Sequence, residues 1–123
     1  MSAFSDNELT FLHDGPKLAR LATVDAAGDP HVVPTGWSYN PAHGSIDVGG
    51  IALASTQKYR NVARTGRAAI VIDDVQPPWQ PRAVLVKGSA EARGDLIRIR
   101  PERIISWGIE SNQIGERSSR DAG

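Results

Sequence analysis

Hydroxyl, amide and cationic side chains gather in one short segment, STQKYRN, which covers residues 55–61. The segment follows an apolar run, and its pattern predicts a helix over 57–65 that ends at Gly66. Free N–H groups at the start of a helix carry partial positive charge and favour phosphate. The residues therefore indicate an anion site, with an ordinary capped surface helix as the alternative. The side chains that could cap the helix or contact phosphate are Ser55, Thr56, Lys58 and Arg60.

Four aromatic residues form a second unusual set. Trp37 and Tyr39 share one face of a predicted strand, because side chains alternate with a period of two. Trp79 lies in a proline-rich stretch and Trp107 lies near a polar tail. Aromatic side chains on loops and chain ends mark an interface or a flat ligand, with ordinary packing as the alternative. Together with the anion site, they favour a planar phosphorylated ligand.

Other kinds of chemistry find little support. His13, His31 and His43 are scattered, no motif of a hydrolase or a metalloenzyme is present, and we expect no metal site. Acidic and basic residues balance at 14 each, which disfavours nucleic-acid binding. The chain has no cysteine, no apolar run of the roughly 20 residues that span a bilayer, and no signal-peptide pattern at its start. We therefore expect a cytoplasmic protein without membrane or nucleic-acid partners.

The pattern along the chain predicts one domain over 1–123 that is mainly β, a barrel or a sandwich of six or seven short strands with two short helices. A capping box at Ser5 and Glu8 predicts a first helix over 5–13. Pro34 and Gly36 predict a bulge or an edge in the second strand, and Gly88 predicts another bulge. We expect a loop over 74–81, a turn at Pro101 before the last strand, and a mobile tail over 110–123. The strands are expected at 18–24, 31–39, 45–50, 67–73, 82–93, 96–100 and within 101–109.

The order of these segments resembles the pyridoxamine 5′-phosphate oxidase-like split β-barrel proteins, which bind flavins or deazaflavins. The resemblance covers about residues 18–109 and rests on LARLATVDAAGDPHVVPTGWSYNP, SIDVGG, STQKYRNVARTGRAAIVIDD and VLVKGSAEA. The chain is most similar to the branch of this family that uses coenzyme F420, and the ending LIRIRPERIISWGI is similar to the ending of one subfamily.

This resemblance implies a split-barrel homodimer with the cofactor at the dimer interface. It implies that the segment around Lys58 holds the cofactor phosphate and that the VVPTGW strand lines the ring system. It also implies that Trp79 and Trp107 reach the site from the partner subunit. The implied cofactor-binding residues are Val33, Pro34, Thr35, Gly36, Ser55, Thr56, Gln57, Lys58, Arg60, Asn61, Trp79 and Trp107. No catalytic acid or base is assigned.

The leading hypothesis is an F420-dependent oxidoreductase that transfers a hydride to a small organic substrate. FMN also has a planar ring and a phosphate, so an FMN-dependent oxidoreductase is the alternative, and a non-catalytic F420- or flavin-binding protein is a second one. The oligoglutamate tail of F420 would need cations at the pocket mouth, for which Lys17, Arg82 and Lys87 are candidates. One feature departs from the subfamily: only Arg93, Gly94 and Asp95 lie between AEA and LIRI, where a longer stretch is expected.

Overall fold

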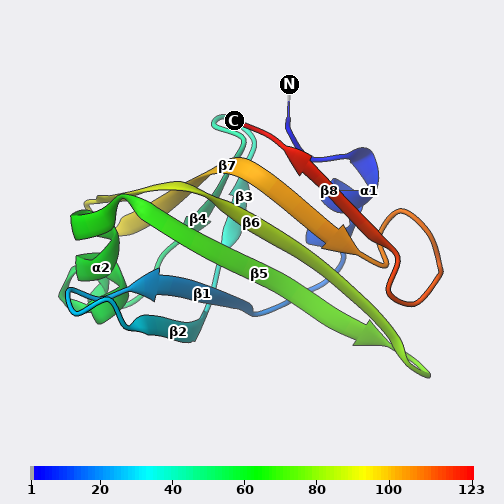
Figure 1. The fold of residues 1–123 in the computed structure, drawn as a ribbon, viewed down its shortest axis with the longest axis horizontal. Coiled ribbons are helices and arrows are strands. Elements are labelled where there is room, and N and C mark those ends of the chain that lie inside the picture. Colours follow the sequence, from blue (N-terminus) through cyan, green and yellow to red (C-terminus); the bar gives the residue numbers. More distant parts are fainter. Residues whose placement is uncertain (1) are drawn as a thin grey trace.

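The computed structural model describes residues 2–123, which form one antiparallel sheet with the order β2-β1-β5-β6-β7-β4-β3, and with β8 beside β7 (Figure 1). The edge strands β2 and β3 are joined only by Gly36 and Trp37, so the sheet curls until its two edges come near each other. This confirms the mainly β barrel. The strands are β1 (Ala19–Val24), β2 (Pro30–Thr35), β3 (Ser38–Asn40), β4 (Ser45–Val48), β5 (Arg67–Gln76), β6 (Gln80–Arg93), β7 (Leu96–Trp107) and β8 (Arg117–Asp121).

Both predicted helices are present. The helix α1 (Asp6–Leu12) begins with the capping box, in which the Ser5 Oγ accepts from the Glu8 N–H and the Glu8 carboxylate accepts from the Ser5 N–H. The helix α2 (Gln57–Thr65) follows a 3-10 turn, η1 (Leu53–Ser55), and ends at Gly66. Gly66 has a φ of 67°, a conformation that costs glycine little. Figure 1 shows α2 at one end of the sheet and α1 beside β8 near the other.

The core is built from alternate residues of the long strands. In β1 the pattern of buried and exposed positions alternates strictly, as a strand with one face on the core requires. The inward-facing side chains that are fully buried include Leu21, Ile46, Val48, Ile70, Ile72, Val84, Val86, Ile97, Ile99 and Ile104. The predicted bulge at Gly88 is confirmed by a register shift between Lys87 and Gly88.

The prediction of a turn at Pro101 is wrong. Residues 96–107 form one strand, β7, in which Pro101 lies opposite the bulge at Gly88. A proline is tolerated at a bulge because the ladder is already interrupted there. A side chain at Gly88 would collide with the Arg100 carbonyl oxygen at 2.0 Å, so the bulge brings the two backbones closer than any other residue would allow.

Three further expectations differ from the structure. Residues 74–81 are not a long loop, since β5 and β6 extend into a tight hairpin around Pro77 and Pro78, whose peptide bond is cis. The predicted strand 31–39 is divided into β2 and β3, which pair with different strands. The tail expected to be mobile contains β8, which pairs with β7 and is anchored to α1 by ion pairing between Arg120 and Glu8.

Candidate functional site

One face of α2 is turned toward the sheet and carries polar side chains. At 100° per residue, Lys58, Asn61, Val62 and Thr65 lie on the same side of the helix, and α2 packs against β1 and β6. Lys58 is half-buried, and within residues 2–123 its ammonium has no hydrogen-bond or ion-pair partner. Lys58 is therefore a cation whose charge no group within residues 2–123 neutralises.

The start of α2 uses most of its side chains for its own structure. The Thr56 Oγ1 caps the helix by accepting from the Tyr59 N–H at 3.3 Å and donates to the Leu53 carbonyl. The Ser55 hydroxyl donates to the Ala52 carbonyl at 2.8 Å. Capping, the alternative interpretation of these hydroxyls, is therefore what the structure shows for Thr56.

Two backbone donors remain free at this helix start. The N–H groups of Gln57 and Lys58 belong to the first turn of α2, and no acceptor for either is found within residues 2–123. The Arg60 guanidinium folds back to donate to the Ser55 carbonyl at 2.7 Å and to the Gln57 Oε1 at 2.9 Å. The donors left open within residues 2–123 thus include the two amides, the Lys58 ammonium and the remaining N–H groups of Arg60.

Asn61 has a structural role that the sequence did not reveal. Its Oδ1 accepts from the Gln57 Nε2 at 2.7 Å, and its Nδ2 donates to the Thr23 Oγ1 at 3.0 Å. Asn61 and Thr23 are both buried. The sequence did contain a signal for Thr23, because it is a polar residue at an inward position of the alternating strand β1.

The segment Val33–Gly36 forms the end of an edge strand. On its other side, β2 has no strand partner within residues 2–123, so half of its backbone groups are not used by the sheet. A Cβ built on Gly36 meets nothing within 4 Å, and its φ is not positive. Neither packing nor backbone conformation therefore requires glycine at this position. A flat ligand could approach the backbone closely here.

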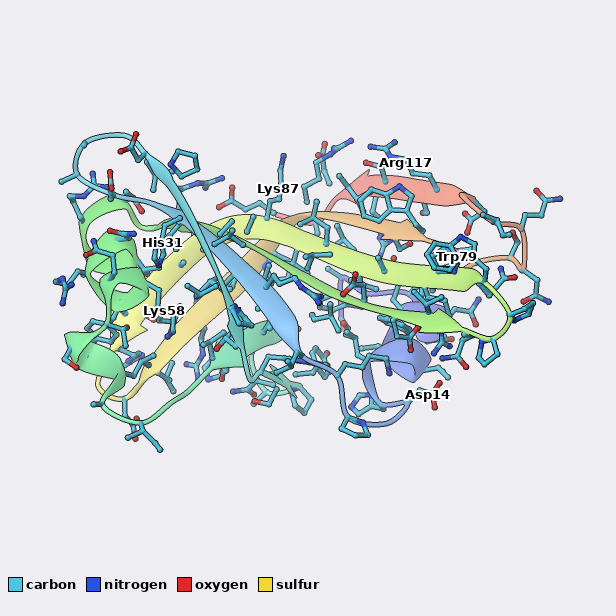
Figure 2. The ribbon with its side chains drawn as sticks, turned by 90° about the horizontal axis from the view of Figure 1, so that it is seen from below. Asp14, His31, Lys58, Trp79, Lys87 and Arg117 are labelled. Carbon is cyan, nitrogen blue, oxygen red and sulfur yellow. The ribbon has the colours of Figure 1, made fainter. Side chains whose placement is uncertain are left out.

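A groove of about 430 Å³ opens beside the same face of α2. It is lined by Thr23 and Val24 of β1, Thr65 of α2, and Arg67 and Lys87 of the neighbouring strands. Arg67 is paired with Glu102 at 2.8 Å, whereas Lys87 is exposed and has no partner within the described part of the chain. Lys87 is labelled on the face seen in Figure 2.

The other two candidate cations for an anionic tail are committed elsewhere. The Lys17 side chain is only 3% exposed, donates to the Phe11 carbonyl at 3.0 Å and lies 3.8 Å from Asp74. The Arg82 guanidinium also holds Asp74, with Nη2 at 2.6 Å from the carboxylate. Hydrogen bonds from Arg82 keep the pKa of Asp74 below its usual value, although burial opposes them. Of the three, only Lys87 is free to meet a ligand.

The two tryptophans expected in the site lie far from α2 within one chain. Figure 2 shows Trp79 and Lys58 at opposite ends of the molecule. Trp107 pairs with Ala83, whereas α2 meets β6 near Ala90. Seven residues of strand separate these positions, which is about 23 Å. A single chain therefore does not bring the two tryptophans to the segment around Lys58.

The short connection that departs from the subfamily is a two-residue hairpin of Gly94 and Asp95 between β6 and β7. The Tyr59 hydroxyl donates to the Gly94 carbonyl at 3.0 Å, so the hairpin is fastened to α2. No helix among residues 2–123 has the length and apolar character to cross a bilayer. Over the same residues, no three histidine, aspartate or glutamate side chains come together as they would around a metal ion.

The model of the family described as "Pyridoxamine 5'-phosphate oxidase" matches residues 5–121. A curated relative from Streptomyces rimosus subsp. rimosus, a 5a,11a-dehydrotetracycline/5a,11a-dehydrooxytetracycline reductase, is 37% identical over 132 residues. The match covers 96% of this chain and 92% of the relative. A relative that is this similar over nearly its whole length supports oxidoreductase chemistry.

Two solved structures share the fold at low sequence identity. A heme binding protein from Mycobacterium smegmatis aligns with a TM-score of 0.76 and 18% identity, covering 99% of this chain and 59% of that one. This chain thus spans less than two thirds of that protein. A structure described as an F420 reductase aligns with a TM-score of 0.58 and 20% identity, covering 74% of this chain and 90% of the other.

Proposed function

The chain belongs to the pyridoxamine 5′-phosphate oxidase family, and on that premise we propose that it is an F420-dependent oxidoreductase that reduces a small organic substrate. The single observation that carries the proposal is the start of α2, where the half-buried residue Lys58 has an ammonium without a partner within residues 2–123 and two backbone amides are free. This donor set suits a phosphate. When bound, the cofactor supplies the hydride.

The residues of the chain bind and orient this cofactor. Lys58 and the N–H groups of Gln57 and Lys58 hold the phosphate. The unused backbone edge of β2 from Val33 to Gly36 lies along the ring, where Gly36 leaves room for it. Ser55, Thr56, Arg60 and Asn61, which the resemblance implies near the phosphate, also shape this end of α2 through their hydrogen bonds.

A homodimer is part of the proposal. Outward-facing apolar side chains run across the sheet, with Ala22 beside Val32 and Val71 beside Leu85, and Val24, Val32 and Val75 are exposed. Exposed apolar side chains that gather on one face mark an interaction surface. Trp79 is 63% exposed at the tip of the β5–β6 hairpin, where it can reach a second chain.

The dimer has a direct test. Because Trp79 lies at the far end of its own chain from Lys58, it can contact a cofactor held there only from a partner subunit. We expect a dimer in sedimentation velocity at micromolar concentration and weaker cofactor binding by Trp79→Ala. A purely monomeric protein would contradict the shared site.

FMN is the alternative cofactor, because its ring and phosphate would use the same donors. The proposal favours F420 because Lys87 is exposed and unpartnered beside the groove, where it can attract the carboxylates of the oligoglutamate tail. Side-by-side titrations of F420 and FMN test this choice. F420 should bind more tightly, whereas FMN that co-purifies at full occupancy would favour the FMN-dependent enzyme.

A non-catalytic binding protein is the other alternative. The reductase activity of the Streptomyces relative favours an enzyme. An assay with candidate conjugated ketones distinguishes an enzyme from a binding protein. The ketone should oxidise reduced F420, and the returning absorbance of oxidised F420 measures the reaction. Tight binding of the cofactor without turnover of any acceptor would favour a carrier or a sensor.

A further inference from the structure

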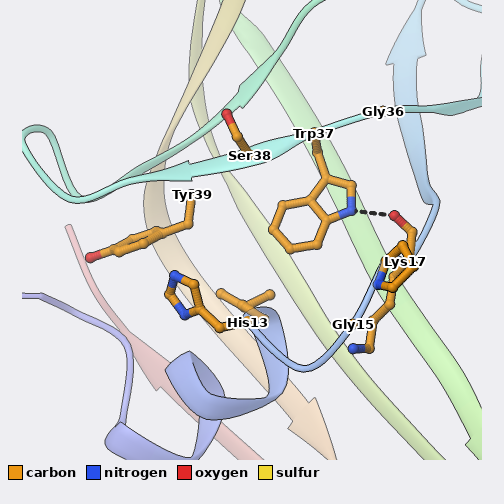
Figure 3. Close-up of a pocket in the computed structure, with 9 residues that line it drawn as sticks. His13, Gly15, Lys17, Gly36, Trp37, Ser38 and Tyr39 are labelled. Carbon is orange, nitrogen blue, oxygen red and sulfur yellow. Dashed lines mark hydrogen bonds between the residues drawn. The ribbon is translucent and has the colours of Figure 1, made fainter.

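A second pocket lies between the end of α1 and the β2–β3 connection. It has a volume of about 420 Å³, within the range of small-molecule sites, roughly 300–1,000 Å³. We call it the aromatic pocket; its walls include Leu12, His13, Pro16, Gly36, Trp37 and Tyr39. Figure 3 shows the side chains of Trp37 and Tyr39 extending toward His13, with Ser38 pointing away.

The aromatic walls are fixed by hydrogen bonds. The Trp37 Nε1 donates to the Lys17 carbonyl at 2.8 Å, which sets the orientation of the indole. The Tyr39 hydroxyl donates to the Ser2 Oγ at 3.1 Å. The rings of His13 and Tyr39 meet edge to face, with centroids 5.9 Å apart. A pocket with walls ordered in advance loses little entropy when a flat ligand enters.

The polar groups of the pocket define which ligand fits. The Lys17 ammonium is taken up by backbone carbonyls and Asp74, so it leaves no free charge in the pocket. The His13 Nδ1 lies 2.7 Å from the Leu9 carbonyl, which can only accept, so this nitrogen carries the proton. In the neutral ring the Nε2 is then an acceptor, and no partner for it is found within residues 2–123.

From these observations we propose that the aromatic pocket binds a planar aromatic or conjugated ring whose hydroxyl group donates to the His13 Nε2. Trp37 and Tyr39 contact the ring, and the commitment of Lys17 to other partners favours an uncharged ligand. Gly36 borders both this pocket and the strand proposed to lie along the cofactor ring, so the ligand would sit beside that ring as the substrate. The substrate role rests on the proposed function; the binding of the ring does not.

The experiment uses three probes on the cofactor-free protein. The first is 2-naphthol, which is planar and donates a hydrogen bond. In 2-methoxynaphthalene the donor is lost, and in decahydro-2-naphthol the aromatic plane is lost. Binding is followed by the indole N–H resonances of the three tryptophans in NMR titrations. We expect 2-naphthol to bind most tightly and to shift the Trp37 resonance more than those of Trp79 and Trp107.

Variants locate the binding. His13→Leu should weaken 2-naphthol about fivefold and leave 2-methoxynaphthalene unchanged, since one neutral hydrogen bond is lost. Tyr39→Leu should weaken both aromatic probes about two- to tenfold. His43→Gln, in the exposed turn between β3 and β4, is the matched control and should change nothing. Equal effects of the two histidine changes, or no preference among the probes, would overturn the proposal.

The two proposals fail separately. The protein could bind neither F420 nor FMN and still bind 2-naphthol with an affinity that Lys58→Ala does not alter. That result would support the aromatic pocket and contradict the proposed function. Displacement of 2-naphthol by FMN would show that the probe occupies the cofactor site, and would overturn the aromatic pocket. If the protein binds the cofactor but no probe shifts the Trp37 resonance, the proposal of the aromatic pocket is likewise overturned.

Discussion

The Nδ2 of Asn61 on α2 donates a hydrogen bond to the Oγ1 of Thr23 on β1 across 3.0 Å. Both residues are buried, and the bond fixes how α2 lies against the sheet. Lys58 lies one helical turn before Asn61 on the same side of α2. The position of the Lys58 ammonium therefore depends on the hydrogen bond between Asn61 and Thr23, in which Lys58 takes no part.

Replacing Asn61 with alanine should lower the free energy of unfolding by roughly 1–3 kcal/mol, because a buried polar partner is lost and Thr23 is left unsatisfied. Urea denaturation measures the change. In a double-mutant cycle with Thr23→Val, the two changes should not add, since each removes the same bond. Ala63→Ser, at an exposed position on the opposite side of α2 from Asn61, is the control. Additive effects would show that the bond does not position the helix.

Lys58→Ala should weaken cofactor binding about ten- to a hundredfold, because a hydrogen bond from a charged donor contributes roughly 1.5–3 kcal/mol. Stability should change by less than about 0.5 kcal/mol, since the ammonium has no partner within residues 2–123. Arg64→Gln, a charge change at an exposed position of the same helix where the guanidinium already donates to the Val24 carbonyl, should leave the affinity unchanged. Unaltered affinity in Lys58→Ala would make α2 an ordinary capped helix.

The preference for F420 over FMN should shrink as salt increases. Exposed charge pairs contribute about 0–1 kcal/mol each and are screened over roughly 8–10 Å. The carboxylates of the tail are such charges, whereas the ring and phosphate contacts are shared by both cofactors. Lys87→Gln should reduce the preference at low salt without affecting FMN. A preference that is independent of salt and of Lys87 would contradict this account of the tail.

The ion pair between Glu8 and Arg120 should make stability depend on pH. Burial by itself raises the pKa of the Glu8 carboxyl. Hydrogen bonds from Arg120 and from the Ser5 N–H together lower it by more than burial raises it, so the pKa of Glu8 lies below its usual value. The folded pKa is thus lower than the unfolded one, about 4.3. The contribution of Glu8 is fully present above the unfolded pKa and is lost as the pH falls through the folded one.

Glu8→Gln isolates this effect from that of the other carboxylates. The difference in unfolding free energy between the native protein and Glu8→Gln should be constant from pH 7 to about 5 and should decrease toward pH 3. Arg120→Met should cost roughly 3 kcal/mol at pH 7, because it leaves a buried carboxylate without its partner. A difference that grows as the pH falls would show that the pKa of Glu8 is raised instead.

Some of this structure could be predicted because its causes are local. The capping box at Ser5 and Glu8, and the start and end of α2 at Thr56 and Gly66, depend on residues within one turn of each other. Alternation predicted β1, β5 and most of β6, and the bulge at Gly88 followed from a glycine inside a strand. The sequence by itself therefore determined most of the elements, the class of fold and the cation-bearing helix.

Only the tertiary structure decided which groups are free to act. Asn61 and Lys17 resemble ligands in the sequence, but Thr23 and Asp74, both distant in the chain, occupy them. Pro101 continues a strand rather than turning it because Gly88 on another strand makes room. The aromatic pocket likewise needs α1 and the β2–β3 connection side by side. Such pairings depend on which distant segments meet in the folded chain, and no pattern of neighbouring residues encodes that.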